Sequence, residues 1–263
     1  MLLVADIGNT NTVFGLYDRF ANEATLVGHW RVATDARCTA DELHALLCAL
    51  FKMDKISLRD VTAMSIASVV PPLIGQYRKL ARTLINKEPL ILCAQTPIGL
   101  QIAIENSTEI GADRLADAVA AVHLFGAPVI IVDFGTATNI EVISANGVFV
   151  GGIIAPGLQT SAEALFAAAA RLSKIDIGIP SKVIGASTRE AVQSGLTYGE
   201  IDRIDGLITR ILAELAVDAG NCPVVATGGL SSLVTPLSRT ITCTNDNLTL
   251  EGLRLIYEMQ SAK

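Results

Sequence analysis

The chain lacks most of the short motifs by which enzymes are recognised from sequence. It has no G-x-x-x-x-G-K-S/T phosphate loop, no G-x-G-x-x-G dinucleotide fingerprint, no G-x-S-x-G elbow and no H-E-x-x-H zinc motif. Only three histidines are present, and they are far apart: His29, His44 and His123. We interpret His44 and His123 as structural residues on helices. Carboxylates, one arginine and threonine-rich turns remain as candidates for chemistry.

Clusters of positive charge and uninterrupted apolar runs are also missing. The formal net charge is −6 and no Lys/Arg-rich run occurs, which argues against a nucleic-acid partner. The longest apolar region, residues 115–132, is broken by Asp117, His123 and Pro128, so it cannot cross a membrane as one helix. No basic segment precedes the first apolar stretch. We therefore expect neither a signal peptide nor a membrane partner.

Cysteine is sparse, and its pattern argues against disulfides. The five cysteines are odd in number and dispersed, and none forms a C-x-x-C pair: Cys38, Cys48, Cys93, Cys222 and Cys243. Such cysteines are typical of reduced thiols in a cytoplasmic protein. The 263 residues are 51% hydrophobic and 17% charged, which indicates a folded chain of one large domain or two ordinary ones.

A polar turn separates two apolar stretches near the N-terminus. Residues 2–7 are apolar apart from Asp6, and a second apolar stretch begins at Val13. This pattern predicts a strand, a tight turn and an antiparallel strand. The turn consists of Gly8, Asn9, Thr10, Asn11 and Thr12. Its backbone N–H groups can bind phosphate oxygens, with Asp6 holding a metal-bound water beside them, but an ordinary Asx-rich turn explains the same residues.

The same pattern returns about half the chain later. Residues 129–134 are apolar except for Asp133, and Gly135-Thr136-Ala137-Thr138 leads into another apolar stretch. A repeated half predicts two related domains with the two turns on either side of one cleft. Two matched turns rarely arise by accident, so we favour a phosphate-binding cleft over two unrelated hairpins.

Strand-like and helix-like patterns alternate through the rest of the chain. A capping box at 39–42 precedes an amphipathic helix, and Pro71-Pro72 follows a buried strand and begins the next helix. An alanine-rich helix is expected at about 159–172. A strand at 224–227 leads into Gly228-Gly229, which fits either a binding place for a flat ring such as adenine or a plain strand-to-helix turn. An amphipathic helix at 248–259 closes the chain.

A third acidic candidate lies outside both repeats. Gly111-Ala112 brings Asp113 and Arg114 to the start of a predicted helix. Asp113 is a candidate base for a hydroxyl proton, and Arg114 could bind a substrate carboxylate with two hydrogen bonds. A helix-start carboxylate stabilised by the helix dipole, with Arg114 as its surface neighbour, is an equally good interpretation from the residues alone.

These segments resemble type III pantothenate kinase, a family also called Bvg accessory factor. The resemblance runs in the family's order through Asp-Ile-Gly-Asn-Thr-Asn-Thr, Gly-Ala-Asp-Arg, Asp-Phe-Gly-Thr-Ala-Thr and Gly-Gly-Ile-Ile-Ala-Pro-Gly-Leu, over essentially the whole chain. It implies an α/β fold with duplicated ribonuclease-H-like halves, mixed sheets flanked by helices, as in the acetate and sugar kinase/Hsp70/actin superfamily. We expect an N-terminal domain at 1–114 and a C-terminal domain, with dimer and substrate contacts, at 115–263.

The resemblance also implies an activity. It is the ATP-dependent phosphorylation of the primary hydroxyl of pantothenate, the first step towards coenzyme A, in a cytoplasmic homodimer. The implied cofactors are Mg²⁺ or another divalent cation and K⁺ or NH₄⁺. Asp113 would accept the proton, Asp133 would bind the monovalent cation, and Asp6 would hold Mg²⁺ through water. The implied ATP-binding residues are Asp6, Ile7, Gly8, Asn9, Thr10, Asn11, Thr12, Val13 and Thr136. The implied substrate-binding residues are Gly111, Ala112, Asp113, Arg114 and Thr188.

Three residues depart from the family's pattern. Ile104 stands where the family usually has a tyrosine that meets pantothenate, Ser107 replaces a proline, and Asp117 stands where asparagine is common. The missing phenol removes a hydrogen bond worth about 1 kcal/mol, which affects substrate binding or choice rather than chemistry. Two alternatives stay open: a non-catalytic accessory or regulatory protein of the same fold, and a kinase for a different hydroxy-acid acceptor.

Overall fold

The computed structural model describes residues 1–18, 24–169, 172 and 174–262. The chain divides into two compact units, which are described separately. Unit 1 comprises Met1–Leu100, Glu105–Ala120 and Leu248–Lys263, and unit 2 comprises Gln101–Ile104 and Ala121–Asn247. The boundary expected after residue 114 differs from this division. Helix α3 (Ala112–Phe125) contributes to both units, and the C-terminal helix belongs to unit 1.

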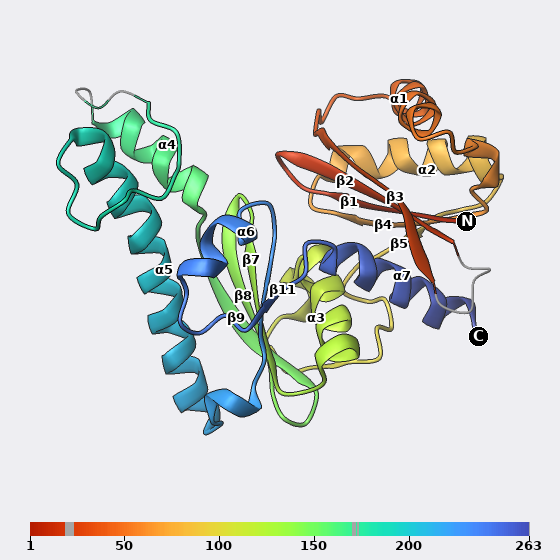
Figure 1. Cartoon of the computed structure of the whole chain (residues 1–263). Coiled ribbons are helices and arrows are strands. Elements are labelled where there is room, and N and C mark those ends of the chain that lie inside the picture. The colour runs from red at the N-terminus through yellow and green to blue at the C-terminus, as the bar shows by residue number, and fades with distance from the viewer. Residues whose placement is uncertain (19–23, 170–171, 173, 263) are drawn as a thin grey trace. The chain divides into compact units, whose positions relative to one another are not determined.

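The sheet of unit 1 has five strands in the order β3-β2-β1-β4-β5 (Figure 1). Strands β1, β2 and β3 are antiparallel neighbours, whereas β4 runs parallel to β1, and β5 runs parallel to β4. Short hairpins can join antiparallel strands only, so the helices α1 and α2 provide the connections to the parallel strands. The strands are β1 (Leu2–Ile7), β2 (Asn11–Asp18), β3 (Thr25–Ala33), β4 (Ala63–Ser68) and β5 (Leu90–Ile91).

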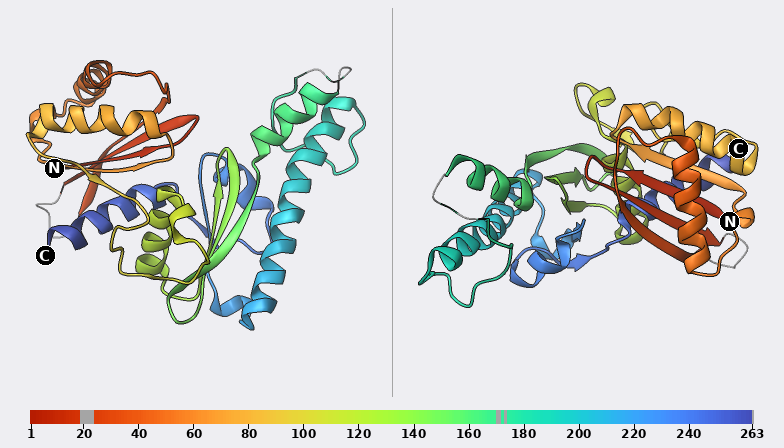
Figure 2. Two further views of the ribbon diagram at one scale, coloured as in Figure 1. Left: turned by 180° about the vertical axis from the view of Figure 1, so that it is seen from behind. Right: turned by 90° about the horizontal axis from the view of Figure 1, so that it is seen from above.

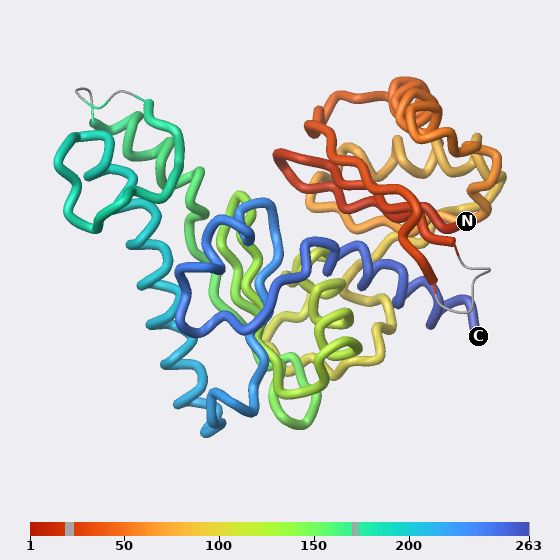
Figure 3. The backbone as a smooth tube through the Cα atoms, viewed as in Figure 1, coloured from red at the N-terminus to blue at the C-terminus, as the bar shows by residue number. Residues whose placement is uncertain are grey.

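Helices cover both faces of this sheet. On one face lie α1 (Ala40–Met53) and α2 (Pro71–Ile85), which begin at the predicted capping box and proline pair and share a core with the strands (Figures 1 and 2). Helix α7 (Leu248–Ser261) packs on β1 and β4, and Ser65 Oγ donates a hydrogen bond to Leu253 O at 3.2 Å. The tube in Figure 3 shows this C-terminal segment running beside the N-terminal strands. Two 3₁₀ turns are η1 (Leu58–Asp60) and η2 (Ser107–Glu109).

The sheet of unit 2 repeats that of unit 1. Its order is β11-β10-β7-β8-β9-β6, with β7, β8 and β9 antiparallel and with β10 and β11 continuing in parallel. The edge strand β6, which pairs in parallel with β9, has no counterpart in the sheet of unit 1. The strands are β6 (Gln101–Ile102), β7 (Val129–Phe134), β8 (Ala137–Ile143), β9 (Val148–Pro156), β10 (Val224–Thr227) and β11 (Cys243–Thr244). The predicted duplication therefore extends from the turns to the whole sheet.

One face of this sheet packs against α4 (Leu158–Ala168) and the long helix α5 (Thr188–Leu215) (Figure 2). The predicted alanine-rich helix ends earlier than expected, and residues 170 and 171 of that prediction lie outside the described residues. The remaining short elements are η3 (Ala219–Asn221), α6 (Ser231–Val234) and η4 (Thr235–Leu237). Among the described helices, none has the length and apolar character that a membrane crossing requires.

Candidate functional site

The first turn joins β1 to β2 as a tight hairpin. Asp6 pairs with Val13 across the hairpin, and Gly8 N donates to Asn11 O at 3.0 Å. The carboxylate of Asp6 is half-buried at the carboxyl end of β1, whereas Asn9 and Thr10 at the tip are exposed. The predicted strand, turn and antiparallel strand are confirmed, and the turn presents backbone and short polar side chains to its surroundings.

Thr34, directly after β3, forms hydrogen bonds with this turn. Thr34 N donates to Thr10 O at 3.0 Å, and the hydroxyls of Thr34 and Thr12 are 2.8 Å apart. Thr12 is only 2% exposed. Burial raises the pKa of the Tyr77 hydroxyl, and a hydrogen bond with Thr12 opposes that rise. The Thr12 side chain therefore stabilises the turn from its buried side. Asn9 and Thr10 remain exposed at the tip.

Asp113 lies at the edge of the unit 1 sheet that carries Asp6. Strands β1 and β4 are parallel, so their carboxyl ends share an edge, and Val69 N just beyond β4 donates to Ile7 O at 3.1 Å. A Cβ built on Gly111 would lie 3.8 Å from Val69 Cγ1, which places the start of α3 beside that edge. The same Cβ would lie 2.3 Å from Asp113 Oδ1, so a larger residue at position 111 would displace the Asp113 carboxylate.

The Asp113 carboxylate is held by its own helix. Its Oδ1 accepts a hydrogen bond from Arg114 N at 2.9 Å, and both side chains are half-buried. Ala112 is buried and anchors the start of α3. This geometry fits a helix-start carboxylate as well as a proton acceptor, so the catalytic role of Asp113 stays a prediction.

The second turn, between β7 and β8, copies the first with one residue fewer. Asp133 pairs with Asn139, six positions later, whereas Asp6 pairs with a residue seven positions later. Gly135 N donates to Ala137 O at 3.0 Å and closes the turn. Thr136 is exposed at its tip and Asp133 is half-buried. The repeated carboxylate and glycine thus occupy equivalent places in the two sheets.

A glycine directly after β10 lies against the Asp133 carboxylate. Thr227 pairs with Asp133, and the next residue, Gly228, has φ +88°. A Cβ at Gly228 would lie 2.3 Å from Asp133 Oδ1 and 2.7 Å from Phe134 N. Only glycine combines this backbone conformation with such close packing. The strand-to-helix turn therefore accounts for Gly228 without a bound ring.

The second turn is anchored by contacts that sequence reasoning missed. Thr136 O accepts hydrogen bonds from Gly157 N at 3.1 Å and from Thr160 Oγ1 at 2.6 Å, at the start of α4. On α5, Glu200 Oε1 accepts a hydrogen bond from Thr138 Oγ1 at 2.7 Å. A signal was present, because Glu200 is a carboxylate within the buried stripe of α5 that includes residues 197, 201 and 204.

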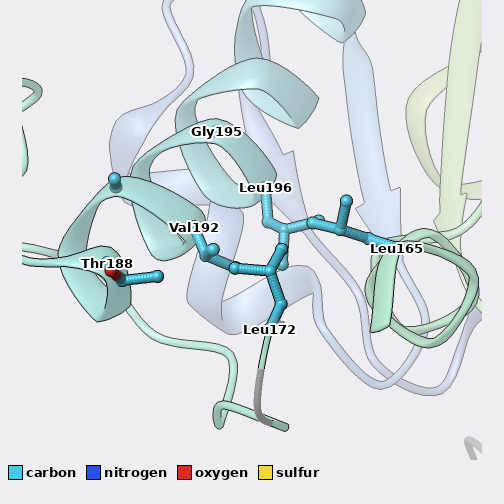
Figure 4. A pocket seen from close by; sticks show the side chains of 7 residues that line it. Leu165, Leu172, Thr188, Val192, Gly195 and Leu196 are labelled. Atoms are coloured by element: carbon cyan, nitrogen blue, oxygen red, sulfur yellow. The ribbon is translucent and has the colours of Figure 1, made fainter. Parts of the chain in front are cut away.

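Thr188 lies at the first residue of α5, directly after the N-cap Ser187, whose side chain accepts from Glu190 N. There it lines a mostly apolar pocket of about 510 Å³, which Figure 4 shows. Thr188 contributes the hydroxyl among these side chains. The pocket is lined by Leu165, Leu172, Thr188, Ala191, Val192, Gly195 and Leu196.

The described residues contain no group of three or more His, Cys, Asp or Glu side chains arranged as a metal cage. Mg²⁺ retains several waters and uses one or two carboxylates with substrate phosphates, which suits Asp6 beside the first turn. Asp133, packed against the peptide of Gly228, offers carboxylate oxygens, the ligand type that hard cations prefer.

Comparison with known proteins identifies the family. Residues 2–210 match the family model described as type III pantothenate kinase. A relative of that name from Roseiflexus sp. (strain RS-1) is 46% identical over 98% of this chain and 99% of its own length. The relative from Acidobacterium capsulatum is 44% identical, over 100% of this chain and 96% of its own length.

Two solved structures support the fold. One, described as a Baf family transcriptional activator from Campylobacter jejuni, has a TM-score of 0.60 and 18% identity over 99% of this chain and 100% of its own. Another, described as an N-acetylmannosamine kinase from Listeria monocytogenes, has a TM-score of 0.52 and 11% identity over 98% of this chain and 99% of its own. Such low identities establish the predicted sugar-kinase-like α/β fold alone. The sequence matches carry the assignment further, and the chain belongs to the type III pantothenate kinase family.

Proposed function

We propose that this protein transfers the γ-phosphate of ATP to the primary hydroxyl of pantothenate in the cytoplasm. The product would be 4′-phosphopantothenate, the first intermediate towards coenzyme A. The observation that carries the proposal is the 42–46% identity, over nearly the full length, to relatives named type III pantothenate kinase. The presence of both carboxylate turns and of Asp113 favours a kinase over a non-catalytic protein of the same fold.

In unit 1 we assign the phosphates to the first turn. Residues 6–13 would bind the phosphates of ATP through backbone N–H groups, and Asp6 would hold Mg²⁺ through a water molecule. The divalent cation would neutralise charge on the phosphates. Gly111 and Ala112 would line the pantothenate site, where Arg114 would pair with the substrate carboxylate.

In unit 2 we assign the monovalent cation, K⁺ or NH₄⁺, to Asp133. Thr136, at the exposed tip of the second turn, would contact ATP. Thr188 would contact pantothenate from the first turn of α5. These assignments rest on the Asp133 carboxylate, which packs against Gly228, and on the exposure of Thr136 and Thr188.

The reaction needs positioning and one proton acceptor. As the hydroxyl oxygen of pantothenate forms a bond to the γ-phosphorus, the bond from that phosphorus to the β,γ-bridging oxygen breaks and ADP leaves. The hydroxyl proton passes to a carboxylate oxygen of Asp113. An ionised carboxylate can accept a proton on either oxygen, so the hydrogen bond from Arg114 N to Oδ1 leaves Oδ2 available for this step.

ADP release with pantothenate, Mg²⁺ and K⁺ tests the proposal. We expect turnover in the parent protein and a fall in kcat of about 10²–10⁴ in Asp113→Asn, because the amide cannot accept the proton. Glu109→Gln, at an exposed carboxylate four residues earlier, is the matched control and should keep parental kinetics. Equal kcat in the parent and Asp113→Asn would show that Asp113 is not the proton acceptor. Turnover only with another hydroxy acid would instead identify a different acceptor.

We also propose a homodimer formed through the segment that precedes α5. Gln193 and Thr197 hold residues 176–178 against the helix by donating to Asp176 O and Gly178 O at 2.9 Å. The ordered segment nevertheless leaves Ile179, Val183 and Ile184 45%, 65% and 87% exposed. Covering such apolar side chains with a second copy removes them from water.

Sedimentation velocity tests the dimer. Ile184→Lys should convert the dimer to monomer, because it would bury an unpaired charge at the interface. Lys182→Ala, two positions earlier and also exposed, is the control that should remain dimeric. A parent protein that sediments as a monomer at micromolar concentration would contradict this proposal.

A further inference from the structure

An ion pair on α5, which the proposed reaction does not use, joins the buried carboxylate of Glu200 to the half-buried guanidinium of Arg203 and contacts strands β8 and β9 beside the second turn. We call it the Glu200–Arg203 pair. Glu200 is 5% exposed, and its Oε1 accepts the hydrogen bond from Thr138 Oγ1 at 2.7 Å. Thr138 is 1% exposed and belongs to β8, two positions after Thr136. Glu200 is therefore one side-chain hydrogen bond away from the strand that carries the tip of the turn.

Arg203 extends the same contact to the next strand. Its Nη2 pairs with Glu200 Oε2 and also donates to Pro156 O at 3.0 Å. Pro156 ends β9 and pairs with Ala137, which directly follows Thr136. Strands β8 and β9 are thus joined to α5 by one carboxylate and one guanidinium.

A third connection acts on the turn itself. Gly157, next to Pro156, donates to Thr136 O, and a Cβ at Gly157 would lie 2.4 Å from Gly135 O. A shift of Pro156 would move Gly157 with it and disturb this hydrogen bond. The Glu200–Arg203 pair consequently influences Thr136 along two routes, through β8 and through the junction of β9 with α4.

Stability alone does not explain a charged pair at this place. Burying a carboxylate costs free energy that its ion pair only roughly repays, and well-packed apolar residues usually stabilise a helix face at least as well. A buried carboxylate whose two oxygens both accept hydrogen bonds, as those of Glu200 do from Thr138 and Arg203, does, however, define one geometry. The contacts made by this pair all converge on the residues that surround Thr136.

We propose that Glu200 is a positioning residue for the second turn, and that it sets the affinity for nucleotide by fixing Thr136 through Thr138 and the Arg203–Pro156 contact. This inference rests on the proposed function, in which Thr136 contacts ATP. It adds a role for α5 in nucleotide binding through residues that never touch the nucleotide.

Steady-state kinetics and binding of a non-hydrolysable ATP analogue test the inference. Glu200→Gln and Thr138→Val should each raise the KM for ATP and the Kd of the analogue about tenfold, the order expected for loss of one hydrogen bond to a charged group. The KM for pantothenate should stay within twofold, because Glu200 lies about three helical turns from Thr188. Thr138→Ser keeps the hydroxyl and should restore the parental KM for ATP. Glu214→Gln, at an exposed carboxylate on α5, is the control.

The outcomes separate this inference from the proposed function. A parent protein that releases no ADP with pantothenate would overturn the proposed function, yet the analogue's Kd would still test Glu200. A parent that is active, with a KM and Kd for nucleotide unchanged in Glu200→Gln and Thr138→Val, would overturn the inference. Parallel losses of kcat and thermal stability at an unchanged KM for ATP would also overturn it, because they indicate a purely structural pair.

Discussion

Single glycines fix the geometry beside the second turn. At Gly157 and Gly228 an added Cβ would meet backbone or carboxylate atoms at 2.4 Å and 2.3 Å. Gly151, on β9, has φ +141° but faces open space. A glycine in the sequence therefore indicates permissive backbone, and the surrounding atoms decide whether it also permits a close contact.

We expect Gly228→Ala to lower the free energy of unfolding by about 2–3 kcal/mol, because alanine is strained at positive φ and would contact Asp133 Oδ1. Urea unfolding measures this change, and the K⁺ concentration for half-maximal activity should rise in parallel. Gly220→Ala, where an added Cβ meets nothing within 4 Å, is the control. Equal stability of the two variants would contradict the close contact.

Ile104 offers a test by gain of function. Ile104→Tyr should lower the KM for pantothenate about fivefold at unchanged kcat, because it restores a phenol worth about 1 kcal/mol of hydrogen bonding. Ile104→Phe supplies the ring without the hydroxyl and should leave the KM near the parental value. If phenylalanine and tyrosine act alike, the hydroxyl has no part in substrate binding.

Helix α5 makes three different kinds of contact. Its apolar face packs on the unit 2 sheet, Glu200 contacts the second turn, and Asp205 accepts hydrogen bonds from the loop after η4. The shortest of these hydrogen bonds come from Ser238 Oγ at 2.6 Å, Thr240 Oγ1 at 2.7 Å and Arg239 N at 3.0 Å. The buried carboxylates of Glu200 and Asp205 thus connect the same helix to two different segments of unit 2.

Asp205 makes stability depend on pH. Burial raises the pKa of its carboxyl, but hydrogen bonds from Ser238, Arg239 N and Thr240 outweigh burial and hold the pKa below its usual range. The carboxylate therefore contributes stability above the ordinary pKa of an unfolded aspartate, about 4, and that contribution is lost as pH falls through the lower folded pKa.

We accordingly expect Asp205→Asn to lower the free energy of unfolding by about 2 kcal/mol at pH 7. This difference from the parent should shrink below about pH 4. Thermal unfolding across pH 3–7 measures both effects. Asp202→Asn, one turn earlier with a side chain that is 73% exposed, should show neither. A pH-independent difference would mean that the Asp205 charge is not what stabilises the loop.

For the molecule as a whole, the two ends of the chain meet in unit 1. Helix α7 packs on β1, and Thr249 Oγ1 donates to the buried carboxylate of Asp117 at 2.7 Å. Gly252 lies against α3, where an added Cβ would be 2.0 Å from Ala116 O. Helix α7 is therefore packed within the first unit rather than attached to the second.

Gly252→Ala should destabilise unit 1 by about 3 kcal/mol, because the added methyl group meets backbone that cannot rotate away. Hydrogen exchange should show faster exchange in α7 and β1 than in the parent. Gly199→Ala, an exposed helical glycine with open space around it, should instead gain about 0.5–1 kcal/mol. Unchanged protection of α7 in Gly252→Ala would show that the two helices can separate at little cost.

Local patterns were enough to predict the hairpins, the capping box at Thr39 and Glu42, and the helix that begins at Pro71, because each depends on neighbours in sequence. The repeated Asp-x-Gly turns were likewise visible, and they indicated the duplicated sheets. Contacts between distant segments were not predictable in this way. Glu200 with Thr138, Gly228 with Asp133, and α7 within unit 1 join residues far apart in the chain, and only packing in three dimensions brings them within hydrogen-bonding or van der Waals distance.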